Sequence, residues 1–255
     1  MAHYVLILGG GQGTRLNNIT PKQFLELNGI PIIMHSAYAF LESDPTCKIY
    51  IGLPTDYISE WSALTQKYNF NINHELFEGG QKRLETVYLG IKRIMQENKC
   101  GLDDIISIHD GARPFIDAVF ISDLISDAKI YGSAVPVLSL KDALIRYKIT
   151  SPLSNTKTIN SINRIHYKTT QTPQIFKFHV IEKSYKNLYD LISKEGSNAS
   201  ILSSIFDDAS VYENFKPSKG PKTHVVSGRE YNIKITTPMD YYMAPYIYDF
   251  YKSMK

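Results

Sequence analysis

Four glycines follow directly on an apolar run near the start of the sequence: Gly9, Gly10, Gly11 and Gly13. Glycine lets a backbone approach an anion and present its N–H groups without a side chain in the way, so this spacing indicates a phosphate-binding loop. The loop departs from two common nucleotide motifs. Thr14-Arg15 stands where a P-loop needs Gly-Lys, and Leu16 stands where a dinucleotide fold needs its third glycine.

Two cations accompany the loop: Arg15 lies inside it, and Lys22 follows between Pro21 and Gln23. Fixed positive charges at such a place suit a nucleoside triphosphate whose α-phosphate is attacked, because charge develops on its oxygens in the transition state. For the glycines alone, a tight turn with both cations in solvent is an equally good interpretation.

A carboxylate, Asp110, follows a second apolar run at residues 104–109. In an open α/β sheet ligands bind beyond the carboxyl ends of the strands, so Asp110 would face the same site as the glycine loop. There it could hold Mg²⁺ together with substrate phosphates. A strand-terminal Asp that caps the next turn is the alternative. His109 is expected to be packed and not catalytic.

These groups need elements that bring them to one edge of a sheet. Short apolar runs alternate with helix-period segments, which predicts a Rossmann-like α/β fold with a mostly parallel sheet and helices on both faces. The expected strands are residues 4–8, 48–53, 104–109 and 133–137, and the expected helices are residues 35–41, 57–68, 83–96 and 118–131. Helices near 180–192 and 201–213, a strand at 224–226 and a helix from 239 would complete a single domain over 1–255.

Residues 138–170 interrupt this pattern with Ser, Asn, Lys and Thr and only weak alternation. A long excursion without helical period is usually functional or a docking element, and a lone two-stranded hairpin is marginal in water. The segment therefore predicts an extended β-arm that crosses to the other subunit of a two-fold homodimer. A disordered surface loop is the alternative.

Composition excludes several classes of protein. Among 255 residues, 28 Lys and Arg against 25 Asp and Glu give a net charge of +3, which is too weak for a nucleic-acid partner. A hydrophobic fraction of 43% is enough for a core, yet no run of about 18 apolar residues would span a membrane. Without a leader peptide, Cys47 and Cys100 are expected to be reduced thiols of a cytoplasmic protein.

Six ordered motifs resemble the 2-C-methyl-D-erythritol 4-phosphate cytidylyltransferase family, also called 4-diphosphocytidyl-methylerythritol synthases, over nearly the whole chain. The motifs are Leu8-Gly9-Gly10-Gly11-x-Gly13-x-Arg15 with Pro21-Lys22-Gln23, Gly79-Gly80-x-x-Arg83-x-x-Thr86-Val87, His109-Asp110-x-Ala112-Arg113-Pro114, Gln171-Thr172-Pro173-Gln174, Asp207-Asp208-Ala209-Ser210 and Asn232-Ile233-Lys234-Ile235-Thr236. The resemblance implies a fold of the nucleotide-diphospho-sugar transferase type and an enzyme of isoprenoid precursor synthesis.

The resemblance also implies roles for single residues. CTP phosphates would be wrapped by Gly9, Gly10, Gly11 and Gly13, and the α-phosphate steadied by Arg15 and Lys22. Cytosine and its ribose would be read at Gly80, Gln81 and Thr86. Asp110 matches the Mg²⁺ carboxylate. The residues that match those around the polyol phosphate and the reacting centre are Arg113, on the side that a second subunit's arm approaches, Arg164, Thr172 and Lys234.

In the reaction that the resemblance implies, an oxygen of the polyol phosphate attacks the α-phosphorus of CTP in line and pyrophosphate leaves. That nucleophile is already an anion at neutral pH and needs no general base. Catalysis therefore consists of holding two mutually repelling anions together. Several cations and one metal carboxylate suit this task.

Two positions depart from the family pattern. Ala143 stands where a threonine is usual at the start of the arm, and Tyr231 replaces an acid that would accept hydrogen bonds from polyol hydroxyls. A second hypothesis is therefore a ribitol 5-phosphate cytidylyltransferase, which makes CDP-ribitol for a wall or capsule polymer. A third is a non-catalytic nucleotide-binding regulator, against which the intact Arg15, Lys22 and Lys234 argue.

Overall fold

The computed structural model describes residues 1–10, 21–149, 157–196 and 200–254. Its main feature is an eight-stranded sheet with the order β10-β7-β11-β6-β1-β4-β5, in which β12 also pairs with β7. The strands of this sheet are β1 (His3–Leu8), β4 (Lys48–Leu53), β5 (His74–Glu78), β6 (Ile105–Asp110), β7 (Ser133–Ser139), β10 (Lys168–Thr170), β11 (Gln174–Lys177) and β12 (Val225–Ser227). Strands β6, β1, β4 and β5 run parallel to one another, so the predicted α/β fold with a mostly parallel sheet is confirmed.

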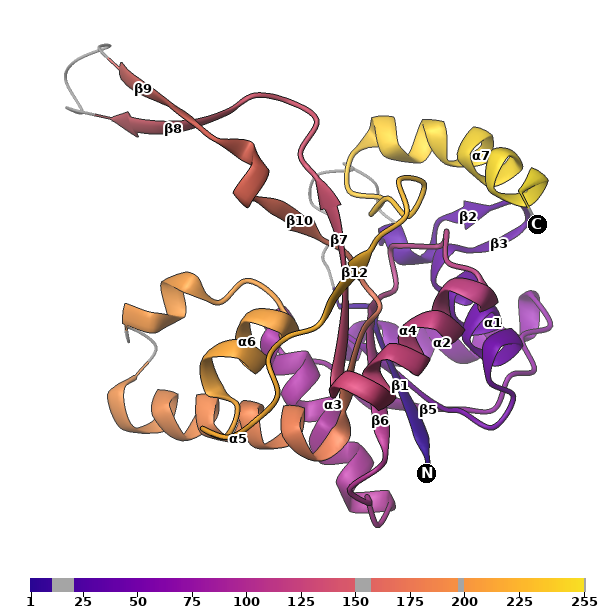
Figure 1. The fold of residues 1–255 in the computed structure, drawn as a ribbon. Helices are drawn as coiled ribbons and strands as arrows, with labels where there is room; N and C mark the ends of the chain where they lie inside the picture. The colour runs from indigo at the N-terminus through magenta and orange to yellow at the C-terminus, as the bar shows by residue number, and fades with distance from the viewer. Residues whose placement is uncertain (11–20, 150–156, 197–199, 255) are drawn as a thin grey trace.

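Helices cover both faces of the sheet (Figure 1). They are α1 (Ile32–Ser43), α2 (Thr55–Lys67), α3 (Arg83–Glu97), α4 (Ala118–Tyr131), α5 (Phe178–Glu195), α6 (Asp208–Phe215) and α7 (Pro238–Ser253). The short 3₁₀ helices are η2 (Lys22–Phe24), η3 (Arg164–His166) and η4 (Ser200–Ser204), and β2 (Glu26–Leu27) pairs with β3 (Ile30–Pro31).

Strand β1 shows why the chain forms these layers. Its side chains alternate, so that Val5 and Ile7 pack with α1, α2 and α4, whereas Tyr4 and Leu6 pack with α3, α5 and α6. Every residue of β1 is buried, as expected for a parallel strand covered by helices on both faces. The strands are thereby fixed rigidly beneath the edge at which they end.

Three parts of the fold differ from the sequence-based expectation. Residues 201–213 form no single helix, because the Asp207 carboxylate accepts a hydrogen bond from the Ser210 amide and begins α6 there, after the separate helix η4. Strand β5 was not predicted. Strand β11 was not predicted either, and it lies antiparallel between β6 and β7. Both are short, and each has only two adjacent apolar residues with polar residues on either side, so neither shows the alternation typical of a strand.

The arm forms the predicted hairpin. Strands β8 (Leu144–Ile149) and β9 (Lys157–Ile162) pair in antiparallel register from Leu144–Ile162 to Ile149–Lys157. The hairpin projects away from the sheet and helices, and β10 brings the chain back along β7 (Figure 1). Residues 150–156, between the two hairpin strands, lie outside the described part. Among the described residues, no helix is long and apolar enough to cross a bilayer.

Candidate active site

The glycine loop and Asp110 begin side by side at the carboxyl edge of the sheet. Leu8 and Asp110 are register partners at the ends of β1 and β6. The Gly9 amide donates to the Gly52 carbonyl at 2.8 Å, and the Gly111 amide donates to the Leu8 carbonyl at 2.9 Å. The predicted convergence of the two motifs is therefore present, because three neighbouring parallel strands end at one level.

Gly9 is packed so closely that no side chain fits. A Cβ there would collide with the Leu53 side chain and come within 3.0 Å of Ile33. The side-chain amide of the buried Gln23 donates to the Gly9 carbonyl. This bond holds the segment that carries Lys22 against the start of the loop. Three predicted phosphate-binding residues, Gly11, Gly13 and Arg15, lie outside the described residues.

The predicted base-reading segment lies next to this loop. A Cβ on Gly10 would be 3.6 Å from the Thr86 hydroxyl oxygen, and the Gly80 amide donates to the same oxygen at 3.1 Å. The Gln81 amide donates to the Glu85 carboxylate at 2.8 Å, while the Gln81 side chain is exposed. Thr86 is buried and holds the turn together, and the Gln81 side chain is an exposed group at this turn.

Asp110 carries the densest group of charges at this edge. Its Oδ1 accepts from Arg83 Nε at 2.9 Å, its Oδ2 lies 2.8 Å from Lys234 Nζ, and Arg113 Nε lies 3.7 Å from Oδ2. Burial by itself would raise the pKa of Asp110, but the three cations outweigh it and hold that pKa well below its usual range. Asp110 is therefore ionised at neutral pH.

A buried chain of hydrogen bonds supports Asp110 from behind. The Asp110 amide donates to the Thr172 hydroxyl at 3.0 Å, the hydroxyl donates to His109 Nδ1 at 3.2 Å, and His109 Nε2 donates to the Arg113 carbonyl at 3.0 Å. Burial lowers the pKa of His109 to about 3, so the ring is neutral and packed, as predicted. The Thr172 hydroxyl is also buried, and both of its hydrogen bonds are made within the protein.

Lys234 reaches the site through a fastened segment. The Asn232 backbone carbonyl accepts from the Arg113 guanidinium at 2.8 Å and from the Gln171 side-chain amide at 3.0 Å. The Ile235 backbone amide donates to the Ala112 carbonyl at 2.9 Å. These bonds place Lys234, which is distant in sequence, beside Asp110. The predicted group of Asp110, Arg113, Thr172 and Lys234 is thus brought together in one chain.

Arg164 lies elsewhere. It begins η3 at the base of the arm and donates to the Lys141 carbonyl, and in the part of the chain that the structure describes it makes no ion pair with Asp110. Tyr231 also faces away from Asp110, because its hydroxyl donates to the Asp117 carboxylate at 2.9 Å. Glu230, the acid displaced by one position, forms an exposed ion pair with Lys141 at 2.7 Å.

A divalent cation could use only part of this site. Among the described residues, no three His, Cys, Asp or Glu side chains gather closely enough to form a metal cage. Asp110 Oδ1 is bound by Arg83, whereas Oδ2 faces Lys234, whose side chain is 34% exposed. One carboxylate oxygen with substrate phosphates is a donor set that suits Mg²⁺.

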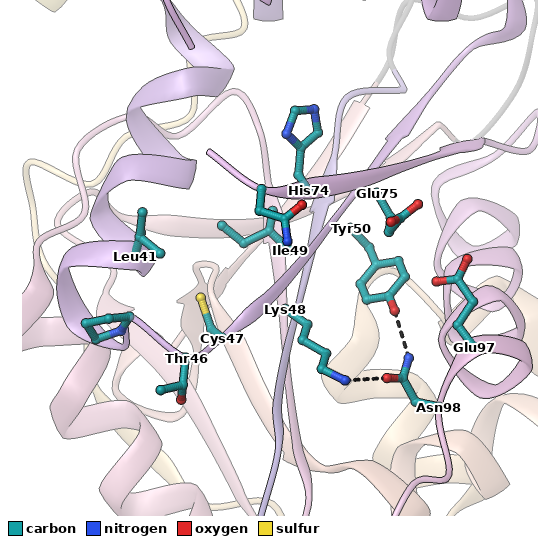
Figure 2. A pocket seen from close by; sticks show the side chains of 12 residues that line it. Leu41, Thr46, Cys47, Lys48, Ile49, Tyr50, His74, Glu75, Glu97 and Asn98 are labelled. Carbon is teal, nitrogen blue, oxygen red and sulfur yellow. Dashed lines mark hydrogen bonds between the residues drawn. The ribbon is translucent and has the colours of Figure 1, made fainter. Parts of the chain in front are cut away.

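A cavity of about 560 Å³ lies at the opposite, amino end of β4 (Figure 2). Its polar side chains bond to one another: Lys48 donates to Asn98 at 2.6 Å, and Asn98 donates to the Tyr50 hydroxyl at 2.8 Å. Cys47 lines it and is free and half-buried, as is Cys100, which agrees with the prediction of reduced thiols. None of the predicted site residues that the structure describes lines this cavity.

Arg83 and Gln23 occur within the sequence motifs, but no role was predicted for either residue. Arg83 binds Asp110 directly, and Gln23 holds the glycine loop. Their spacing was a signal, because Gln23 directly follows Lys22 and Arg83 precedes Thr86 by three residues. Both of these neighbours, Lys22 and Thr86, had predicted roles. What the pattern could not give was the partner of each side chain.

Gly9 and Gly10 beside the turn of Gly79 and Gly80, with a cationic group around Asp110, all at the carboxyl edge of an α/β sheet, are features typical of a nucleotidyltransferase. A family model described as IspD, 2-C-methyl-D-erythritol 4-phosphate cytidylyltransferase, matches residues 3–249. The chain belongs to this family.

Relatives and solved structures agree with this assignment. Proteins named 2-C-methyl-D-erythritol 4-phosphate cytidylyltransferase from Phocaeicola vulgatus and Clostridium beijerinckii are 30% and 34% identical, covering 96% and 94% of this chain and 98% and 96% of their own length. The synthase structure from Anaerococcus prevotii has a TM-score of 0.73 at 20% identity, covering 97% of this chain and 96% of its own. The Francisella tularensis cytidylyltransferase has a TM-score of 0.72 at 23% identity, covering 97% and 100%. These two structures support the fold.

Proposed function

We propose that the chain joins CTP and 2-C-methyl-D-erythritol 4-phosphate to give the CDP-polyol and pyrophosphate. The observation that carries the proposal is the position of Asp110, with Arg83, Arg113 and Lys234 around it, beside the glycine turn. Arg83, Arg113 and Lys234 carry three positive charges against the two negative charges of Asp110 and Asp208, and this excess of positive charge suits anionic substrates. The family and its relatives support the choice of CTP and of the polyol. We further propose that residues 1–255 act as one domain.

In this proposal the polyol phosphate is the nucleophile and the protein positions it. Its oxygen forms a bond to the α-phosphorus of CTP, the bond to the bridging oxygen breaks, and pyrophosphate carries away the electron pair. Arg15 and Lys22 bind the α-phosphate on the loop side, and Lys234 binds it from the Asp110 side. Preorganised cations at such a centre lower the barrier because they meet charge that develops only in the transition state.

The nucleotide would lie across the two glycine turns. Gly9, Gly10, Gly11 and Gly13 would bind the phosphates, and backbone groups at Gly80, with Gln81 and Thr86, would surround the cytosine and ribose. The names of the relatives support a pyrimidine nucleotide, CTP, at this turn.

A divalent cation, Mg²⁺ in the cell, would be held by Asp110 Oδ2 and the CTP phosphates. When bound, it would supply charge neutralisation at the phosphate oxygens. The residues fit this role, since Asp110 Oδ2 is paired with Lys234, whose side chain is 34% exposed and could move aside.

The polyol phosphate would be bound by residues of two subunits. Arg113 and Lys234 lie beside Asp110 and could contact the phosphate, the buried Thr172 hydroxyl supports Asp110 from behind, and Arg164 lies on the arm. An arm that projects from its own subunit, as this hairpin does, can deliver Arg164 and Ala143 to the site of a second copy. A two-fold homodimer through the arm is therefore part of the proposal.

Tyr231 is the observation that favours a second candidate. Its hydroxyl is bound to Asp117, so this position offers the polyol no carboxylate. A ribitol 5-phosphate cytidylyltransferase remains the second candidate for that reason.

Pyrophosphate release from each nucleotide with each polyol phosphate tests the proposal. We expect release from CTP with 2-C-methyl-D-erythritol 4-phosphate, and little with ATP or GTP. Asp110→Asn should remove this activity, whereas Asp103→Asn, a surface change in a carboxylate that is 83% exposed, should keep it. Release only with ribitol 5-phosphate would support the second candidate. No release with either polyol phosphate would indicate a regulator.

A further inference from the structure

Arg83 is the cation that fixes Asp110 most completely. It stands at the first position of α3, and its Nε donates to Asp110 Oδ1 at 2.9 Å. Its two terminal nitrogens donate to the second carboxylate of the site region, Asp208, at 3.0 and 2.6 Å. One guanidinium therefore joins the motif that contains Asp110 to the motif that begins α6. The function proposed above uses neither Arg83 nor Asp208 for a ligand.

The far end of this chain of bonds is rigid. Asp208 is fully buried, and its Oδ1 also accepts from the Tyr185 hydroxyl at 2.6 Å. Tyr185 is fully buried in α5, and burial followed by the Asp208 charge raises its pKa well above the usual value, so it stays a donor. Asp208 has no freedom to turn, and it holds the Arg83 fork in one orientation.

The arrangement leaves the two oxygens of Asp110 in different states. Oδ1 faces Arg83, which is bound on its other side by Asp208. Oδ2 lies 2.8 Å from Lys234, whose partly exposed side chain has no such anchor in the ion pairs of the described residues, and it lies further, 3.7 Å, from Arg113 Nε. Packing alone gives little reason for such a network, because a buried ion pair contributes on average little net stability compared with apolar residues of the same volume.

We propose that Arg83 is a positioning residue that locks Asp110 through Oδ1, so that Oδ2 alone is exchanged between Lys234 and the cation of the bound nucleotide. Asp208 and Tyr185 hold Arg83 in the orientation that this requires. The inference rests on the proposed function for its substrate, but its metal-binding consequence can be measured without turnover.

Arg83→Lys tests this positioning role. Arg83→Lys keeps the charge but loses the planar fork, so one ammonium cannot hold both carboxylates in the same geometry. We expect Mn²⁺ affinity in the presence of CTP, measured by the electron paramagnetic resonance of free Mn²⁺, to fall by about 10- to 100-fold. The kcat should fall by a similar factor, whereas the KM for CTP should change less. Tyr185→Phe, which removes only the hydroxyl on Asp208, should shift both quantities in the same direction and by less.

Two matched controls are available. Arg93 also lies in α3 between two carboxylates, Glu75 and Glu97, so Arg93→Lys makes the same change away from the site. Tyr189→Phe changes a tyrosine one turn further along α5, where the ring stacks on Tyr88. Both controls should keep Mn²⁺ affinity and kcat within about twofold of the wild type.

Thermal unfolding of every variant separates positioning from folding. If Arg83→Lys binds Mn²⁺ more weakly than the wild type at a temperature at which the variant is folded, the result supports the positioning role of Arg83. Arg83→Lys with a lower Tm but wild-type Mn²⁺ affinity and kcat would show that the network is structural, and the proposal would be wrong. Wild-type protein that binds CTP but no Mn²⁺ would overturn it as well. If the wild type releases no pyrophosphate, the proposed function fails, while the Mn²⁺ titration still decides the role of Arg83.

Discussion

The ammonium nitrogen of Lys234 lies 2.8 Å from Oδ2 of Asp110, so the lysine assigned to the reacting phosphate is paired with the carboxylate assigned to the metal. One oxygen cannot keep a lysine and gain a divalent cation at full strength, because the two positive charges repel each other. In the proposed function, binding of CTP with a cation would therefore release Lys234. The released ammonium group would then be available to the phosphates.

Loss of Lys234 should affect turnover more than binding. Removing one preorganised donor at a charge-developing centre costs about 3 kcal/mol, or about 100-fold in rate, so Lys234→Ala and Lys22→Ala should lower kcat by that factor. The KM for CTP should rise far less. Lys129→Ala, an exposed lysine of α4, is the control. Steady-state kinetics in which only KM changes would assign both lysines to ordinary binding.

Removal of the metal or of its ligand should have the same effect. Asp110→Asn takes away one negative charge from three surrounding cations, which weakens the site for a divalent cation and leaves those cations unbalanced. We expect at least about 100-fold loss of kcat, and a comparable loss for the wild type in excess EDTA that added Mg²⁺ restores. Undiminished turnover in EDTA would show that the arginines and lysines alone carry the phosphate charge.

The buried His109 predicts a pH dependence of stability. Burial lowers its pKa in the folded protein to about 3 from an ordinary value of 6.5, so the unfolded chain takes up a proton first as the pH falls. The stabilisation is complete above pH 6.5 and is lost as the pH falls toward 3, with a limiting slope of about 1.4 kcal/mol per pH unit. Urea unfolding between pH 7 and pH 5 measures this slope.

His109→Gln should remove this contribution, because glutamine does not titrate. Its unfolding free energy should therefore depend less steeply on pH than that of the wild type. His166→Gln, at an exposed position in η3, should keep the wild-type slope. If the unfolding free energies of the wild type and His109→Gln depend equally on pH, the pKa of His109 in the folded protein is near its ordinary value and the prediction is wrong.

The arm predicts shared active sites. A hairpin that leaves its own domain has little to pack against, so we expect a homodimer by sedimentation at micromolar concentration. Arg164→Ala and Asp110→Asn should each be nearly inactive, and a mixed dimer should regain activity if Arg164 serves the neighbouring site. A fully active monomer would eliminate arm exchange. A mixed dimer without activity would leave Arg164 serving its own subunit.

Most of the fold could be predicted from periodicity. Strand β4 and helix α4 have the predicted bounds, because each is bounded by clear turn or cap residues and has an unbroken apolar pattern. The failures share a cause. Strand β11 has only four residues, and its place between β6 and β7 depends on partners far away in the sequence.

The site was predictable as a set of residues but not as a network. Strand ends and motif order placed Gly9 and Asp110 at one edge. Side-chain partners are a property of the packed chain, so no spacing rule indicated that Thr172 would bond to His109 or that Arg83 would bridge Asp110 and Asp208. Tyr231 could be recognised as a departure, but only the fold shows that it turns to Asp117.

A competition in one vessel tests the proposed function most directly. The protein is incubated with CTP, Mg²⁺ and equal concentrations of 2-C-methyl-D-erythritol 4-phosphate and ribitol 5-phosphate. The CDP-polyol products are separated and quantified by mass spectrometry. The ratio of the initial rates of formation of the two products is the ratio of kcat/KM for the two polyols. We predict at least about a tenfold excess of the CDP-methylerythritol product, equivalent to about 1.4 kcal/mol of discrimination. An excess of CDP-ribitol, or no CDP-polyol at all, would contradict the proposed function.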